Sequence, residues 1–295
     1  MKTRGFHVAR MRHAWLLALV AGACGGDSDP TGPGNDSRFE ITVRYVGDIP
    51  LAQRQMIETA VGRWRSGIVD ELPDIPLTVP ANACFDGQPA LSELIDDLLL
   101  YVQFAELDGP GNTIAQAGPC YVRSTGSLPV LGNLTIDQED LGVLSQTGLF
   151  DDVVLHELGH VLGIGTLWGP LDLLSGAGSA NPLFTGAFAR AEYETLSGLT
   201  AAVPVENIGD AGTRDGHWRE SVFGNELMTG TLNLAGNPLS VVTIASLRDL
   251  GYVTDNDAAS PYALPAAGLH VDPQDGAGSL EMHRHEVLLR PRFYR

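Results

Sequence analysis

His156-Glu157-Leu158-Gly159-His160 is the stretch of sequence that decides the fold. Residues four apart lie on one face of an α-helix, so His156 and His160 can direct both imidazoles at a single ion. Glu157 follows the first histidine, where its carboxylate can reach a water molecule on that ion. Zinc lowers the pKa of such a water to about 7, and a nearby carboxylate can then take its proton. The stretch therefore predicts half of a catalytic zinc site together with its general base.

The residues around this motif favour a helix. Asp151 and Asp152 suit a first turn, where carboxylates meet the positive end of the helix dipole. Val154 and Leu158 have helical spacing and predict a buried stripe, and Gly163 suits a helix end. We therefore expect the motif on a short helix that ends at Gly163.

A catalytic zinc ion typically takes three protein ligands, so a third ligand is required. A compact motif would place it three residues after Gly163, where the sequence has Thr166. The chain contains 8 histidines. Several lie in the N-terminal leader or in the Gly/Pro-rich tail, namely His7, His13, His270, His283 and His285. Elimination leaves His217 as the leading third ligand.

Acidic residues offer other choices for the third ligand. Asp215 lies in a Gly-Thr-x-Asp segment, which is typical of zincins with an aspartate ligand. Glu192 and Glu194 lie on an expected helix after the motif, where the gluzincins have their third ligand. We favour His217, and we expect Asp215 to shape its loop and the two glutamates to lie on a solvated helix face.

The order of the later motifs points to a family. Trp218 follows His217, and a Glu-Leu-Met-Thr-Gly segment at residues 226–230 comes shortly after. With the first motif, Gly163 and a long insertion, this order resembles the leishmanolysin-type metzincins, in a short bacterial form, over roughly residues 39–262. Neither an aspartate nor a glutamate ligand would account for Gly163 or for the methionine segment.

The resemblance implies a role for each matching residue. It implies one catalytic Zn²⁺ ion on His156, His160 and His217, and Glu157 as the residue that activates water. It also implies that Met228 forms an apolar floor beneath the metal, with Gly163 as a further structural support of the site. The implied activity is that of a zinc metalloendopeptidase, which acts on a peptide or protein substrate and needs no obligate protein partner.

The resemblance also implies an α+β fold of the zincin and metzincin type, with two lobes around an active-site cleft. The N-terminal lobe, residues 39–165, would hold a mixed sheet and the motif helix. The C-terminal lobe, residues 166–262, would hold the third ligand and the methionine turn. Residues 1–23 are expected to form a signal peptide, 24–38 a flexible spacer and 263–295 a loose tail.

Two apolar stretches are expected to be strands of the N-terminal lobe. Leu98 to Ala105 predicts a buried strand, and Val130 to Ile136 predicts an edge strand just before the motif helix. An edge strand can pair with an extended peptide, which binds main chain with little sequence preference. The pattern does not indicate which strand pairs with a substrate.

The N-terminal residues predict export. Basic residues precede an apolar run from Ala14 to Ala23, which is too short to span a membrane but suits a signal peptide. Ala21 to Ala23 fits a small-residue cleavage site, and Cys24 directly after it is a candidate for lipidation. We expect a cell-envelope lipoprotein with a membrane tether at Cys24, and free secretion is the alternative.

The other cysteines and the charge agree with an exported protein. Cys84 and Cys120 remain as an even pair after the leader is removed, so we expect a disulfide between them. The net charge is −18. Because the leader is basic, the remainder carries about −22, which repels nucleic acid and anionic headgroups. The charge excludes nucleic acid as a partner without identifying the substrate.

Two other functions share the metal-binding residues. A zinc-containing surface protein used for adhesion or binding needs the histidines but not Glu157, so the presence of Glu157 favours an enzyme. A zinc amidase acting on a non-protein substrate, such as cell-wall material, would use the same chemistry.

Mass spectrometry of the mature N-terminus from native membranes checks the lipoprotein prediction. We expect Cys24 to carry acyl chains, because buried acyl chains hold a soluble domain at a bilayer. An unmodified mature N-terminus would instead indicate free secretion.

Overall fold

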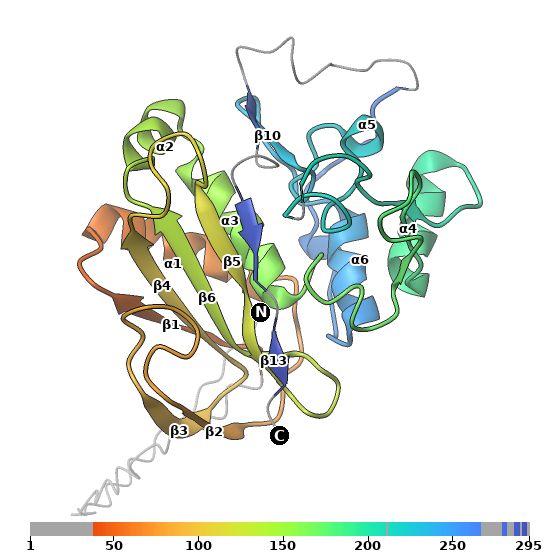
Figure 1. Ribbon diagram of the computed structural model, residues 1–295. Coiled ribbons are helices and arrows are strands. Elements are labelled where there is room, and N and C mark those ends of the chain that lie inside the picture. The colour runs from red at the N-terminus through yellow and green to blue at the C-terminus, as the bar shows by residue number, and fades with distance from the viewer. Residues whose placement is uncertain (1–37, 211, 267–278, 282–285, 290, 294–295) are drawn as a thin grey trace, which may run out of the picture. The chain divides into compact units, whose positions relative to one another are not determined.

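The helix that carries His156 and His160 lies on a mixed sheet (Figure 1). The strands of this sheet are β1 Ile41–Val46, β4 Leu98–Ala105, β5 Ala115–Val122, β6 Pro129–Asp137, β12 Glu286–Leu288 and β13 Arg292–Phe293. Their order is β1-β4-β6-β5, and both C-terminal strands pair with the far edge of β5. β1, β4 and β6 run parallel, whereas β5 runs antiparallel to β6. This arrangement agrees with the expected α+β class and mixed sheet.

The computed structural model describes residues 38–210, 212–266, 279–281, 286–289 and 291–293. These described residues form one compact unit. The expected signal peptide, most of the expected spacer and Cys24 lie outside the described residues. Within the described part of the chain, no helix is both long enough and apolar enough to cross a bilayer. The division into two lobes stays a prediction.

Two helices cover one face of the sheet. α1 (Leu51–Arg65) packs against α3 (Phe150–Leu162), and α3 packs on β5 and β6. Trp64 of α1 donates a hydrogen bond from Nε1 to the Leu155 carbonyl oxygen of α3, at 2.8 Å. The short helix α2 (Leu141–Thr147) follows β6 and leads into α3. The sheet thus fixes α3, which carries the first motif.

A hairpin covers the other face of the sheet. It consists of β2 (Ile75–Val79) and β3 (Leu91–Ile95), which pair antiparallel. Alternate residues of β4 divide between the two faces, as successive side chains of a strand do. Leu98 and Leu100 join the core on the helix side, whereas Leu99 joins a separate core on the hairpin side.

The expected disulfide is confirmed. It joins Cys84, in the loop between β2 and β3, to Cys120 in β5, with 5.7 Å between the Cα atoms. The two cysteines are 36 residues apart in sequence. Closing a loop of this length lowers the entropy of the unfolded chain and stabilises the fold by about 3–4 kcal/mol.

The C-terminal part of the chain consists of short elements around a helix pair. α4 packs against α6, and Ser240 caps α6 by accepting a hydrogen bond at Oγ from the Thr243 amide, at 3.3 Å. The elements are β7 Leu174–Ser175, β8 Leu183–Phe184, α4 Ala187–Ser197, β9 Val203–Pro204, α5 Glu220–Phe223, β10 Thr231–Asn233, α6 Val241–Leu250, the 3₁₀ turn η1 Asn256–Ala258 and β11 Ser279–Glu281. β7, β8 and β9 form one small sheet, and β10 and β11 form another.

Two expectations about strands require correction. Residues 130–136 lie in β6, which is a central strand between β4 and β5 and is buried along its whole length, and not an edge strand. An apolar run shows that both faces of a strand are covered, but it carries no information on how many neighbours the strand has. Among the N-terminal strands, β1 and β5 hold the two edge positions.

The C-terminal residues also differ from the loose tail that the sequence suggested. The described parts beyond residue 263 include β11, which pairs with β10, and β12 and β13, which pair with β5. These strands are only 3, 3 and 2 residues long, too short for an alternating pattern to be recognised in the sequence.

Candidate metal centre

α3 places both histidines and the glutamate of the motif in the protein interior. Its first turn contains the two aspartates that the sequence analysis singled out, and it ends at Gly163 in the left-handed region, with φ +114°. His156, Glu157 and His160 are all 0% exposed. The expected helix, its acidic first turn and its glycine end are therefore confirmed.

The third histidine converges on the same point. His217 lies in the loop between β9 and α5 and is 0% exposed. Its Nε2 atom lies 3.1 Å from the Nε2 atoms of both His156 and His160. The Nε2 atoms of His156 and His160 are themselves 3.0 Å apart. The structure therefore brings together the three histidines that the sequence analysis favoured.

Each imidazole is oriented from behind by a backbone carbonyl oxygen. Nδ1 of His156 lies 2.7 Å from the Leu227 oxygen, and Nδ1 of His160 lies 2.8 Å from the Ile164 oxygen. Nδ1 of His217 lies 3.0 Å from the Thr213 oxygen. A carbonyl oxygen can only accept, so each Nδ1 carries the ring proton. In the neutral ring each Nε2 then presents a lone pair to the other two.

This donor set fits a zinc ion. Nitrogens held about 2.0–2.1 Å from one tetrahedral zinc ion lie about 3.3 Å apart, close to the separations of 3.0 and 3.1 Å here. Three facing lone pairs repel one another unless a cation lies between them. A backbone carbonyl behind each ring is the usual outer partner of a zinc-binding histidine, because it fixes the tautomer and the ring orientation. His156, His160 and His217 are thus the residues that would hold the ion.

Met228 lies directly against the motif helix. It is fully buried, and a Cβ placed on Gly159 would come within 2.7 Å of its Sδ atom. The residue directly before His160 must therefore be a glycine for the methionine to fit. Met228 was predicted from the sequence, whereas the role of Gly159 was not. A glycine in the middle of a helix lowers helix stability, and this unfavourable choice was the sequence signal that its position has a structural role.

A buried carboxylate holds the methionine turn in place. The Glu226 side chain accepts hydrogen bonds from the Met228 amide at 2.6 Å and the Ser240 amide at 3.0 Å, and also from the Thr243 hydroxyl. Burial raises the pKa of Glu226, and these hydrogen bonds to the carboxylate oppose that rise. Thr243 also accepts from Nε1 of Trp218, at 2.7 Å. Glu226 therefore joins the methionine turn to α6, a role that the sequence analysis did not identify.

Two glycines allow the His217 loop to approach the end of α3. Gly165 has φ +73°, and a Cβ on it would lie only 2.1 Å from the Gly216 carbonyl oxygen. Asp215 lies in this loop with φ +68°, and its Oδ2 atom accepts from the Gly178 amide at 2.8 Å. Asp215 thus shapes the loop, as expected, and it is not part of the histidine group.

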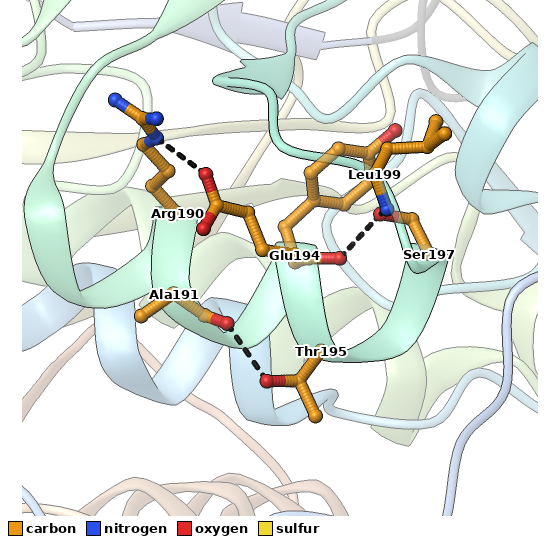
Figure 2. A network of polar contacts seen from close by, with 7 residues as sticks. Arg190, Ala191, Glu194, Thr195, Ser197 and Leu199 are labelled. Atoms are coloured by element: carbon orange, nitrogen blue, oxygen red, sulfur yellow. Dashed lines mark hydrogen bonds and ion pairs between the residues drawn. The ribbon is translucent and has the colours of Figure 1, made fainter.

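The two glutamates considered as alternative ligands lie on α4 and have other partners. Figure 2 shows Glu194 paired with Arg190, at 2.8 Å from its Nε atom, one helical turn away. Glu192 accepts a hydrogen bond from Asn256, at 2.8 Å. Neither glutamate belongs to the histidine group.

The two tryptophans near the motifs are core residues. Trp168 and Trp218 are both 0% exposed, and their rings lie 4.6 Å apart. Phe184 packs against both rings. These aromatic side chains therefore support the histidine loop from the interior and do not line a surface.

The fold and the site define a class of protein: an α+β protein with a buried three-histidine metal centre on a His-Glu-x-x-His helix. The sequence of residues 77–262 matches the family model for leishmanolysin. The chain belongs to the leishmanolysin family of metallopeptidases, which are zinc-dependent. No match was found among the curated proteins. The family expected from the motifs is therefore confirmed.

The assignment of the third ligand is tested by comparing His217→Ala with Asp215→Ala. We expect His217→Ala to weaken zinc binding by at least about 100-fold, because one of three ligands is lost, and Asp215→Ala to weaken it by less than about 10-fold. Competition with a chelator of known affinity measures both values. Full zinc affinity in His217→Ala and its loss in Asp215→Ala would reverse the assignment.

The role of Gly159 is tested by comparing two single glycine-to-alanine variants, one on α3 and one on α1. We expect Gly159→Ala to lower the free energy of unfolding by about 1–3 kcal/mol, because the methyl group overlaps Met228. Gly62→Ala on α1 is the matched control, since nothing lies within 4 Å of a Cβ there. It is expected to raise that free energy by about 0.5–1 kcal/mol. Equal effects in denaturant unfolding would contradict the close contact.

Proposed function

We propose that this protein is an exported zinc-dependent endopeptidase that hydrolyses peptide bonds with Glu157 as general base. One observation carries the proposal: three imidazoles converge next to a buried glutamate, and two of them lie on the same helix as that glutamate. Zinc binding by itself requires only the histidines. A carboxylate adjacent to the first ligand is what a hydrolase adds, because it can move a proton between water and a leaving group.

The residues of the chain divide the chemistry between them. When bound, zinc supplies Lewis-acid polarisation of a carbonyl oxygen and acidifies a water molecule. Glu157 would act as the general base, accepting a proton from the attacking water and giving it to the leaving nitrogen of the peptide bond. The carbonyl oxygens behind the imidazoles keep the three rings from reorienting during turnover. Met228 forms an apolar floor that limits how the ligands can move.

The expected lobes and cleft are part of this proposal. Residues 39–165 contribute the helix with two ligands and the general base, and residues 166–262 contribute His217 and Met228. A peptide would bind between these two groups of residues. The disulfide between Cys84 and Cys120 supports export, because disulfides persist in oxidising compartments outside the cytosol. A tether at Cys24 remains part of the same proposal.

The main alternative functions use the same residues. A silent zinc protein used for adhesion needs no general base, and membership of a peptidase family favours turnover. A zinc amidase that acts on a non-protein substrate differs in substrate alone. The experiment on the general base separates peptide hydrolysis from these two alternatives.

Cleavage of a mixed peptide library by the zinc-loaded protein tests the proposal, with Glu157→Gln as the matched variant. We expect wild-type protein to cut and Glu157→Gln to cut about 10²–10⁴-fold more slowly with unchanged zinc content, since the amide cannot accept the proton. Equal cutting by both proteins would remove Glu157 from the chemistry. No cutting by either protein, with zinc present in both, would favour a non-peptide substrate or a binding role.

A further inference from the structure

The outer edge of β5 is a place where another extended chain can join the main sheet, on the side of the motif helix's partner strand. β5 is the last of the N-terminal strands in the sheet order, and it packs against the motif helix α3. An edge strand offers a row of backbone donors and acceptors that pair readily with an added strand. In this protein the C-terminal residues of the same chain occupy that edge, and Figure 1 shows the dark-blue strand β13 beside β5.

The C-terminal segment pairs with much of β5. Residues 286–288 run parallel to residues 115–117, and residues 292–293 run parallel to residues 121–122. Between the two paired stretches, the Leu289 amide donates to the Ala117 carbonyl oxygen, at 3.0 Å. We name the described residues 286–289 and 291–293 the C-terminal strap. Its backbone occupies groups that any other extended chain would need in order to join the sheet.

The strap also contacts the loop that carries the third histidine. A Cβ on Gly216, the residue before His217, would lie 2.5 Å from Cδ1 of Leu288. A Cβ on Gly118 in β5 would lie 2.8 Å from the Leu289 carbonyl oxygen. The strap therefore lies between β5 on one side and the histidine loop on the other. Glycines at both contacts let its backbone come close.

A second contact fixes the chain just before the strap. β11 pairs antiparallel with β10, and β10 follows the methionine turn by a few residues. The C-terminal residues thus pair on one side with a strand that follows Met228 and on the other with the strand that packs on α3. They connect the elements that contribute the two halves of the metal centre.

The composition of the C-terminus favours pairing with β5, but the paired stretches are too short to bind strongly. Residues 284–295 contain four arginines and a single acidic residue, in a chain with a net charge of −18. Opposite charges favour the association of this segment with the rest of the protein. The paired stretches are short, and the Val287 side chain is 39% exposed while Leu288 and Leu289 are only half-buried. An isolated strand pairing of this length is marginal in stability.

We infer that the C-terminal strap is a built-in competitor for the β5 edge, which it must leave before an extended peptide from another protein can bind beside the metal centre. This inference rests on the proposed peptidase function, because it concerns access of a peptide to the same site. The strap would hold the protein in a low-activity state until it is displaced or removed. The occupant is the chain's own C-terminus, bound through its backbone.

Binding of a labelled strap peptide tests the inference without requiring catalysis. The probe is a fluorescein-labelled synthetic peptide with the sequence of residues 284–295, and the proteins are full-length, zinc-loaded and carry Glu157→Gln. Leu289→Pro removes the amide that donates to Ala117, whereas Leu289→Ala retains it and is the matched control. We expect Leu289→Pro to bind the peptide at least about 10-fold more tightly than either Leu289→Ala or the chain with an unchanged strap. Equal affinities in all three proteins would overturn the inference.

A second variant protects the test against misfolding. Leu288→Asp keeps every backbone amide but replaces the side chain that packs on Gly216, and it should expose the edge in the same way. Zinc content and the unfolding temperature of each variant establish that the metal centre is intact. If both variants are folded and neither gains affinity for the peptide, the strap does not control the β5 edge.

Cleavage assays with Glu157 restored separate this inference from the proposed function. Leu289→Pro is expected to cut the mixed peptide library about 10-fold faster than Leu289→Ala, and the unlabelled strap peptide should slow it again. Tighter peptide binding by Leu289→Pro with no cleavage in any zinc-loaded protein would support the strap and refute the peptidase. Cleavage at equal rates in all proteins would support the peptidase and overturn the competitor role.

Discussion

Three imidazoles face one another with their Nε2 atoms 3.0–3.1 Å apart, and the positions of three separate segments of the chain follow from this contact. Each ring is turned toward the other two by a backbone carbonyl oxygen, and the three oxygens belong to Ile164, Thr213 and Leu227. These residues lie in separate segments of the chain. The site can therefore form only when the end of α3, the His217 loop and the methionine turn are all in place. Metal binding and the packing of these segments support each other, as they do in other metal sites.

Close backbone approach is the means by which these segments meet. Gly159 leaves space for the Met228 side chain on α3, and Gly165 lets the Gly216 backbone approach the turn after the helix. A methyl group at either position would displace an element that carries or orients a ligand. Glu226 supports the arrangement from the other side, since it binds the Met228 amide and the first residues of α6. The glycines and this buried carboxylate have no part in the chemistry, yet they determine where the ligands lie.

β5 connects the stability of the fold to access to the site. Its Cys120 is joined by a disulfide to the loop between β2 and β3, so the strand is anchored to the hairpin on one face of the sheet. The motif helix α3 packs on the other face, and the C-terminal strap pairs with the edge of β5 that faces away from β6. A strand held rigidly at this position is a suitable template for an extended chain, because it loses little conformational entropy when the chain binds. The segment that pairs with the edge of β5 therefore affects whether another extended chain can bind there.

The local features of the site were predictable from the sequence alone. The spacing of His156 and His160, the acidic first turn and the glycine after the helix depend on contacts within a few residues, so the helix could be predicted together with two ligands and the general base. Elimination among the histidines then favoured His217. Only the tertiary structure decided that His217 reaches the other ligands whereas Asp215 turns to Gly178, that β6 is central in the sheet, and that the C-terminus pairs with β5. These features depend on pairing between residues far apart in the chain, and the sequence of one strand does not specify its neighbours.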